Sequence, residues 1–261
     1  MIKTTPFEMV FIIRDTMTEL IQRILPTVQK PARYTGGEFN EVKKDLKDVR
    51  VRVAFCFPDT YEIGMSNVGM RILYGVMNQM DGVWCERVFA PWGDMEAAMR
   101  QHDLPLWALE SQNPVKEFDM VAFTIGYEMS YSNILNMLAL SKIPLRSSQR
   151  EGLKNIVFAG GVCAYNPEPL ADFVDFFALG EGEEITPEII SLYDRAKAED
   201  WSKEPSCMRW QRSPVSMCRP STAMNTMRMA LFGRLFRWMV RRRELPSASW
   251  RIWTVPTGQL R

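Results

Sequence analysis

The sequence predicts an α/β domain in which about five parallel strands form a doubly wound, Rossmann- or flavodoxin-like sheet. Several short segments are apolar throughout, as strands covered on both faces must be. They alternate with stretches in which apolar side chains recur at helical spacing. Polar loops, most of them containing glycine, separate the two kinds of segment. This alternation is typical of a parallel sheet with helices on both faces.

The elements are expected in the following order. Residues 17–25 predict a short helix that stops at Pro26, and a polar loop with a charged stretch continues to residue 50. Strands are expected at 51–57, 84–91, 119–125, 155–161 and 173–181, with a further short one at 104–109. Helices are expected at 65–80, 94–101, 131–141 and 184–196. We therefore divide the chain into an N-terminal extension (1–50), an α/β domain (51–204) and an irregular tail (205–261).

Charge is distributed unevenly along the chain. The net charge is +1, yet residues 205–261 contain eleven Arg, no Lys and one acid, Glu244. The preceding 204 residues carry the opposite excess, with 21 basic and 30 acidic side chains. Such asymmetry separates the tail from the domain before it.

The five cysteines predict no metal site, because none lies in a CxxC or CxxxCxxC pattern. Cys56 and Cys163 lie in apolar runs and are expected to be buried thiols. The apolar run at 9–13 is too short to span a bilayer and lacks the features of an export signal. We expect a cytoplasmic protein.

Candidate binding residues lie in the loops that follow the strands, because ligands of such sheets bind at the carboxyl ends of the strands. The loop at 58–69 offers an acid and two glycines, and the loop at 159–169 offers a glycine pair. Tight turns alone would also explain these glycines, and helix capping would explain the acids at 180–184. The aromatic rings at 127 and 131 line a pocket or the edge of the core. The candidates are Asp59, Tyr61, Gly64, Gly69, Thr124, Tyr127, Gly160, Gly161, Gly180 and Glu181. We predict no catalytic residue and no metal ligand.

Five segments in this order resemble one group of radical-SAM proteins with an N-terminal cobalamin-binding-type domain. They are KPARYTGGE (30–38), FCFPDTYEIGMSNVGMRILYGVMN (55–78), WCERVFAPWGDME (84–96), FDMVAFTIGYEMSYSNILNML (118–138) and FAGGVCAYNPEPLADFVDFFALGEGEE (158–184). The resemblance covers about 17–204. It implies a cobalamin-binding-type fold and a small-molecule cofactor.

The resemblance also implies a departure at the cobalt ligand. Related domains that supply an axial His carry D-x-H-x-x-G after the first strand, whereas this chain has Asp59 to Gly64 with Tyr61 at the His position. The S-x-L element has a loose counterpart at 124–126, and Gly160 and Gly161 match the GG element. The resemblance is therefore compatible with cobalamin bound without a His ligand.

In the family, a radical-SAM barrel follows this domain and is the partner we expect for it. Its CxxxCxxC holds a four-iron, four-sulfur cluster that binds S-adenosylmethionine and cleaves it reductively. This chain contains no such motif. We expect it to be the front part of such an enzyme, truncated and inactive alone, and whether the chain is itself an enzyme stays open.

The tail departs from the family, and a change of reading frame near residues 204–205 would explain it. A shifted reading of codons compatible with 214–230 yields GVYVPSLYGYEYNEDG, which resembles the segment that comes after this domain in the family. By the same resemblance Met17 is the usual start.

Two other functions stay open from the residues alone. One is a stand-alone module for a small ligand or a nucleotide. The other is an interaction domain whose basic tail, with ALFGRLFRWMVRRR at 230–243, binds nucleic acid or a membrane. We do not expect nucleic acid or membrane partners if the tail is out of frame.

Overall fold

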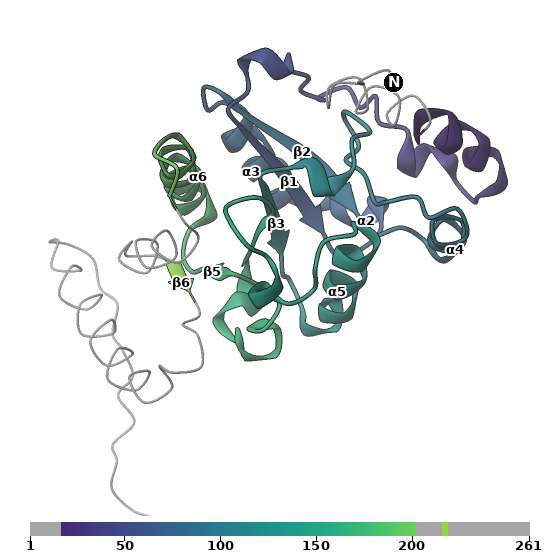
Figure 1. Ribbon diagram of the computed structural model, residues 1–261. Coiled ribbons are helices and arrows are strands. Elements are labelled where there is room, and N and C mark those ends of the chain that lie inside the picture. The colour runs from purple at the N-terminus through teal and green to yellow at the C-terminus, as the bar shows by residue number, and fades with distance from the viewer. Residues whose placement is uncertain (1–16, 202–215, 219–261) are drawn as a thin grey trace, which may run out of the picture. The chain divides into compact units, whose positions relative to one another are not determined.

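A computed structural model describes residues 17–201 and 216–218 of the chain (Figure 1). It contains a six-stranded sheet with the order β2-β1-β3-β4-β5-β6. The strands are β1 (Val51–Phe57), β2 (Val83–Phe89), β3 (Met120–Thr124), β4 (Ile156–Gly160), β5 (Phe176–Ala178) and β6 (Ser216–Cys218). The first five pair in parallel, which confirms the predicted doubly wound α/β fold.

The helices occur where the sequence predicts them, with small shifts at their ends. They are α2 (Tyr61–Ser66), α3 (Val68–Asn78), α4 (Gly93–Gln101), α5 (Tyr131–Leu140) and α6 (Gly182–Ala198), and residues 17–24 are also helical. The helix predicted at 65–80 is preceded by the separate short helix α2. Short 3-10 helices occupy Leu25–Thr27, Pro31–Tyr34, Leu46–Asp48, Val115–Glu117, Glu128–Ser130, Ser147–Gln149, Val162–Tyr165 and Glu168–Leu170.

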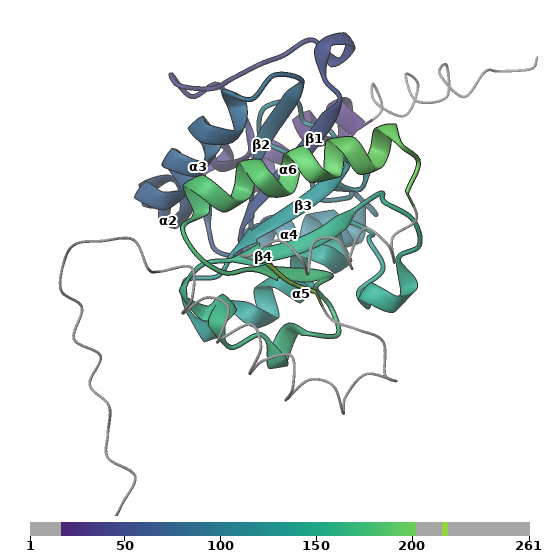
Figure 2. The same cartoon turned by 90° about the vertical axis from the view of Figure 1, so that its left-hand side faces the viewer.

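Two apolar layers hold the helices on the sheet. The helices α3 and α6 cover one face, where Met77 and Ile190 pack with Phe55 of β1 in the same buried cluster. Figure 2 shows both helices lying across that face. The helices α4 and α5, with residues 17–24, cover the other face, where Met95 and Leu138 belong to a second buried cluster. Both faces of the central strands are therefore apolar, which explains why their sequences do not alternate.

The outer edge of β2 is closed by other parts of the chain. The Asn78 side chain accepts from the backbone N–H of Cys85 and donates to its carbonyl oxygen, both at 3.0 Å. The Glu110 carboxylate accepts from the backbone N–H of Arg87 at 2.7 Å, and the N–H of Leu109 donates to the Arg87 carbonyl at 2.8 Å. The outward backbone groups of Cys85 and Arg87 on this edge strand are thus satisfied within the molecule.

The short strand predicted at 104–109 is not formed. This segment makes an isolated bridge between Trp107 and Pro114 and runs along the outside of β2. Its apolar side chains are buried as in a strand, and most of them share a buried cluster with Ile21 and Tyr34 of the chain that precedes the sheet. The apolar pattern alone therefore misassigned the segment.

The second difference lies in the segment predicted to be irregular. Residues Ser216–Cys218 form β6, which pairs antiparallel with β5. Residues 1–16, 202–215 and 219–261, which include the rest of the tail, lie outside the described residues.

Candidate functional site

The carboxyl ends of the parallel strands meet at one edge of the sheet. We call the loops there, with the first residues of the helices that follow, residues 58–68, 90–93, 125–131, 161–170 and 179–184, the carboxyl edge. In the sheet, β2 lies on one side of β1, and β3 lies on the other side and is followed by β4 and β5. The chains leaving β1 and β3 therefore turn toward opposite faces, and a crevice at such a switch point is the usual ligand site of this architecture.

A hydrogen bond joins the two loops at the switch point. The Tyr127 hydroxyl, which follows β3, donates to the Asp59 carboxylate, which follows β1. This bond raises the pKa of Tyr127 to about 12, because ionisation would place two negative charges side by side. The Asn133 side-chain amide adds a second link by donating to the Pro58 carbonyl at 2.9 Å. The structure thus brings together two of the predicted residues from distant parts of the chain.

The glycine pair after β4 has two different roles. Gly161 has φ of 104°, and a Cβ there would lie 2.7 Å from the Ile125 carbonyl oxygen. A Cβ on Gly160 would meet only the Cβ and carbonyl oxygen of Ala178 at 3.6 Å, an ordinary contact. Gly161 is therefore required for the close approach of the loops after β3 and β4. Thr124 is the last residue of β3 and pairs there with Gly160.

Tyr61 and Gly64 contact protein and not open space. The Tyr61 ring lies edge-on to Phe89 with centroids 5.5 Å apart, and its hydroxyl donates to Glu38 at 3.0 Å. A Cβ on Gly64 would lie 2.3 Å from the Phe89 ring. Both residues hold α2 against β2, so close packing explains them.

The other candidates are exposed at helix starts. Gly69 is in the first turn of α3, whose N-terminus is capped by Asn67, the acceptor for the Met70 N–H at 2.9 Å. Gly180 has φ of 132°, and Glu181 occupies the position before α6 without making a side-chain cap. Gly180 and Glu181 belong to the carboxyl edge and Gly69 adjoins it, but no described hydrogen bond joins them to Tyr127 and Asp59 at the switch point.

Exposed apolar side chains gather at the carboxyl edge. Among the described residues, eleven large apolar side chains are exposed, and seven of them belong to this edge. They are Ile63, Val68, Trp92, Tyr127, Met129, Val162 and Tyr165, and Met129 retains 86% of its surface. A group of this kind marks a surface that binds a ligand or another protein domain.

The N-terminal arm, residues 29–50, reaches this edge from the outside of β2. Lys30 and Arg33 pair with Glu62 of α2 at 3.1 and 2.9 Å. The Arg33 guanidinium also lies 5.2 Å from the Trp92 ring centroid. The arm therefore fixes the position of α2 beside the switch point.

A charged cluster beneath the arm has no counterpart among the predicted site residues. Arg87 of β2 is buried and pairs with buried Glu110 at 2.6 Å and with Glu38 of the arm at 3.2 Å. Burial raises the pKa of Glu110 to about 7, although Arg87 opposes this. The sequence signal was the pair Glu86 and Arg87 inside an otherwise apolar strand.

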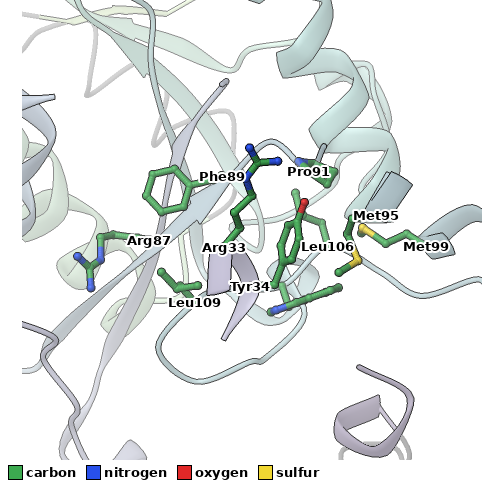
Figure 3. Close-up of a pocket in the computed structure, with 10 residues that line it drawn as sticks. Arg33, Tyr34, Arg87, Phe89, Pro91, Met95, Met99, Leu106 and Leu109 are labelled. Atoms are coloured by element: carbon green, nitrogen blue, oxygen red, sulfur yellow. The ribbon is translucent and has the colours of Figure 1, made fainter. Parts of the chain in front are cut away.

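A cavity of about 20 Å³ lies next to this cluster (Figure 3). Its wall combines two arginines with aromatic, aliphatic and thioether side chains: Arg33, Tyr34, Arg87, Phe89, Pro91, Met95, Met99, Leu106, Trp107 and Leu109. This volume admits a single water and no larger ligand. The cavity is therefore a packing detail of the arm and not a cofactor site.

Within residues 17–201 and 216–218, no group of three or more His, Cys, Asp or Glu side chains is arranged to hold a metal ion. None of the described helices is both long enough and apolar enough to cross a bilayer.

Comparison with known proteins gives one family and one relative. The family described as "Radical SAM proteins, N-terminal" matches residues 69–217. The uncharacterized protein MJ0966 of Methanocaldococcus jannaschii is 24% identical over 143 residues, which are 53% of this chain and 26% of the relative. The chain thus matches about a quarter of that relative's length.

Proposed function

This chain belongs to the family of N-terminal domains of radical SAM proteins, and we propose that it is the non-catalytic, ligand-binding domain of such an enzyme. In intact relatives the iron–sulfur cluster and S-adenosylmethionine are held by a different domain, and the CxxxCxxC of that domain does not occur in this sequence. We propose that the catalytic barrel is the partner of this domain and that the chain has no radical chemistry alone.

One observation carries the proposal: the switch point and the exposed apolar side chains coincide. The pair Tyr127 and Asp59 joins the loops after β1 and β3, and Met129 and Val162 stand beside them with their side chains largely exposed. A ligand bound at the switch point would therefore contact apolar surface as well as backbone.

We propose a corrinoid as the ligand of this edge. The flat face of a corrin ring is matched by exposed aromatic and aliphatic side chains. A protein ligand to cobalt does not fit, because Tyr61 replaces the His and its hydroxyl is bonded to Glu38. When bound, cobalamin would supply cobalt–carbon chemistry, while this domain would orient the ring and shield one of its faces from water.

Titration of the chain with cob(II)alamin, followed by absorbance and calorimetry, tests this function. We expect micromolar binding, and we expect Val162→Asn to weaken it because this side chain is 78% exposed at the edge. Leu46→Asn is the matched control, since Leu46 is exposed at 45% on the arm. An absence of binding at millimolar cobalamin would exclude the corrinoid function.

We also propose that the reading frame changes near residues 204–205. The Arg-rich, Lys-free composition of 205–261 and the family-like shifted translation support this. Two findings weigh against a junction at that point, because the family match continues to 217 and Ser216–Cys218 pairs with β5. Resequencing the DNA through this region decides: a gained or lost base that opens a frame to CxxxCxxC supports the proposal, and an unaltered frame refutes it.

A further inference from the structure

Residues 35–49 of the N-terminal arm, which we call the strap, lie over the charged cluster without entering the core. None of these residues is buried, and the side chain of Phe39 is fully exposed. Segments that bury so little apolar surface open at a lower free energy than the rest of a domain. We propose that the strap opens when Glu110 beneath it loses its proton, and that its opening releases α2 at the carboxyl edge. This inference does not depend on which ligand that edge binds.

Hydrogen bonds to side chains of α3 and β2 attach the middle of the strap. The backbone N–H of Val42 donates to the Tyr74 hydroxyl at 2.8 Å, and its carbonyl accepts from the Trp84 indole at 3.0 Å. The Lys44 ammonium donates to the Asn78 carbonyl at the end of α3, at 2.7 Å. Bonds of this kind exchange for bonds to water at a small net cost, so they permit the strap to open.

The first part of the strap covers the buried ion pair. A Cβ on Gly36 would lie 2.5 Å from the Leu109 carbonyl oxygen, so the strap touches the residue that precedes Glu110. Glu38 pairs with Arg87 at 3.2 Å, and Arg87 also pairs with Glu110 at 2.6 Å. Two carboxylates therefore share one buried guanidinium, which can balance the charge of only one of them.

The groups around the buried acid come from several parts of the chain. The charged or titratable side chains that act on it or on its partner are Arg87, Glu86 and Cys85 of β2, Tyr74 of α3, Tyr61 of α2, and Glu38 and Lys43 of the strap. Lys43 is exposed and pairs with Glu41 at 2.5 Å. Glu86 pairs with Arg52 at 2.5 Å. Arg87 is therefore the cation for which the buried acid and the strap compete.

This competition gives the strap a pH dependence of known sign. Burial raises the pKa of Glu110 to about 7 while the strap is closed, because the charged form loses its water. Opening admits water and removes the Glu38 charge, and both changes lower that pKa. The closed strap thus binds the proton more tightly, so closure is favoured below pH 7 and is lost as the pH rises through 7. Between pH 6 and pH 8 the open fraction should rise about tenfold, as expected for one proton.

Glu38 also joins the strap to α2. The Tyr61 hydroxyl donates to one oxygen of this carboxylate at 3.0 Å, and Arg87 donates to the other oxygen at 3.2 Å. When the strap opens, Tyr61 loses this partner and keeps its ring contact with Phe89. Because α2 has only six residues, Tyr61–Ser66, one lost bond is a large part of its attachment. The state of the buried acid is therefore transmitted to the switch point.

Amide hydrogen exchange of the full chain at pH 6 and pH 8 tests the strap. After correction for the intrinsic exchange rates, the protection of residues 41–49 should fall about tenfold at the higher pH, and the protection of α2 should fall with it. Equal protection of the strap at both pH values would overturn the proposal. Strap amides that exchange as slowly as those of β3 would also overturn it, because the whole domain would then have to open.

Two variants and a control identify the groups responsible. Glu110→Gln cannot ionise, so its strap should stay protected at pH 8, whereas a pH dependence equal to that of the unmodified chain would assign the proton to another group and overturn the proposal. Tyr61→Phe should keep the response of the strap and abolish that of α2; a persistent response of α2 would refute the link to the carboxyl edge. Asp48→Asn is the matched control, because it removes an exposed acid of the strap outside the cluster, and it should retain the full response. Melting temperatures show whether each variant is folded, and the comparison of pH values on the unmodified chain decides without them.

Discussion

Replacing Arg87 by methionine should unfold the domain far more easily at pH 8 than at pH 5. Arg87 is 3% exposed, and it pairs with Glu110, whose side chain is fully buried. Removing one partner of a buried pair leaves the other charge uncompensated, at a cost of about 3–5 kcal/mol. In a domain of this size, that loss lowers Tm by about 6–20 °C.

The pH dependence follows from the Glu110 carboxyl. Its pKa is raised to about 7, above the ordinary 4.5, so the folded state binds the proton more tightly than the unfolded state. This group therefore favours folding below pH 4.5, and that contribution is lost as the pH rises toward 7. Loss of the arginine raises the pKa further. At pH 5 Glu110 of the variant is therefore protonated, and the loss in free energy of unfolding caused by the substitution should fall to about 1–3 kcal/mol.

Urea unfolding of both proteins at the two pH values measures these penalties. The double variant Arg87→Met/Glu110→Gln removes both charges. In the unmodified protein Glu110 accepts from the backbone N–H of residue 87, and the glutamine amide oxygen of the variant can accept in its place. It should recover at least half of the loss at pH 8. A single-variant penalty below 1 kcal/mol at pH 8, or one equal at both pH values, would refute the account of a buried, mutually dependent pair.

Three further predictions concern the carboxyl edge. Gly161→Ala should cost about 1–3 kcal/mol, because φ is 104° and the added Cβ meets a carbonyl, whereas Gly160→Ala should change little; equal losses in thermal unfolding would contradict this. Gly64→Ala should cost about 1–3 kcal/mol by the same assay, since its Cβ would lie 2.3 Å from the ring beneath it, and a neutral result would show that the ring moves freely. Tyr127 should titrate near pH 12 in tyrosine-labelled NMR spectra, and Asp59→Asn should lower that pKa toward 10 because the charged acceptor is gone; an unaltered value would disprove the hydrogen bond.

The strands and helices could be predicted because their signals are local. The apolar runs at 51–57 and 119–125 are continuous since both faces of a parallel strand are covered. The strand predicted at 104–109 was wrong because a buried connection beside an edge strand has the same apolar composition as a strand. Burial selects apolar residues in a strand and in a buried connection alike, so only the hydrogen-bonding partner of the segment distinguishes the two.

That the candidate residues bind a ligand stays a prediction, and the structure shows only what each of them contacts within the protein. The glycines at 64 and 161 were predicted to allow close approach of a ligand, and in the structure the groups that approach them are the Phe89 ring and the Ile125 carbonyl, respectively. Nothing in a linear sequence says whether the neighbour of a glycine is a ligand or another loop. The contact of Tyr61 with Glu38 joins residues 23 positions apart through the arm, which has no periodic pattern to place it.

The closed border of β2 has a consequence for how this polypeptide can be divided. With one border sealed by Asn78, Glu110 and Leu109, a new strand can join the sheet only beyond β5, where β6 now lies. A protein cut at residue 204 would lose that strand and expose the backbone of Phe176–Ala178 to other molecules. Self-association and poor solubility would then result from the position of the cut and not from any loss of core packing. A soluble fragment should therefore extend at least through Cys218.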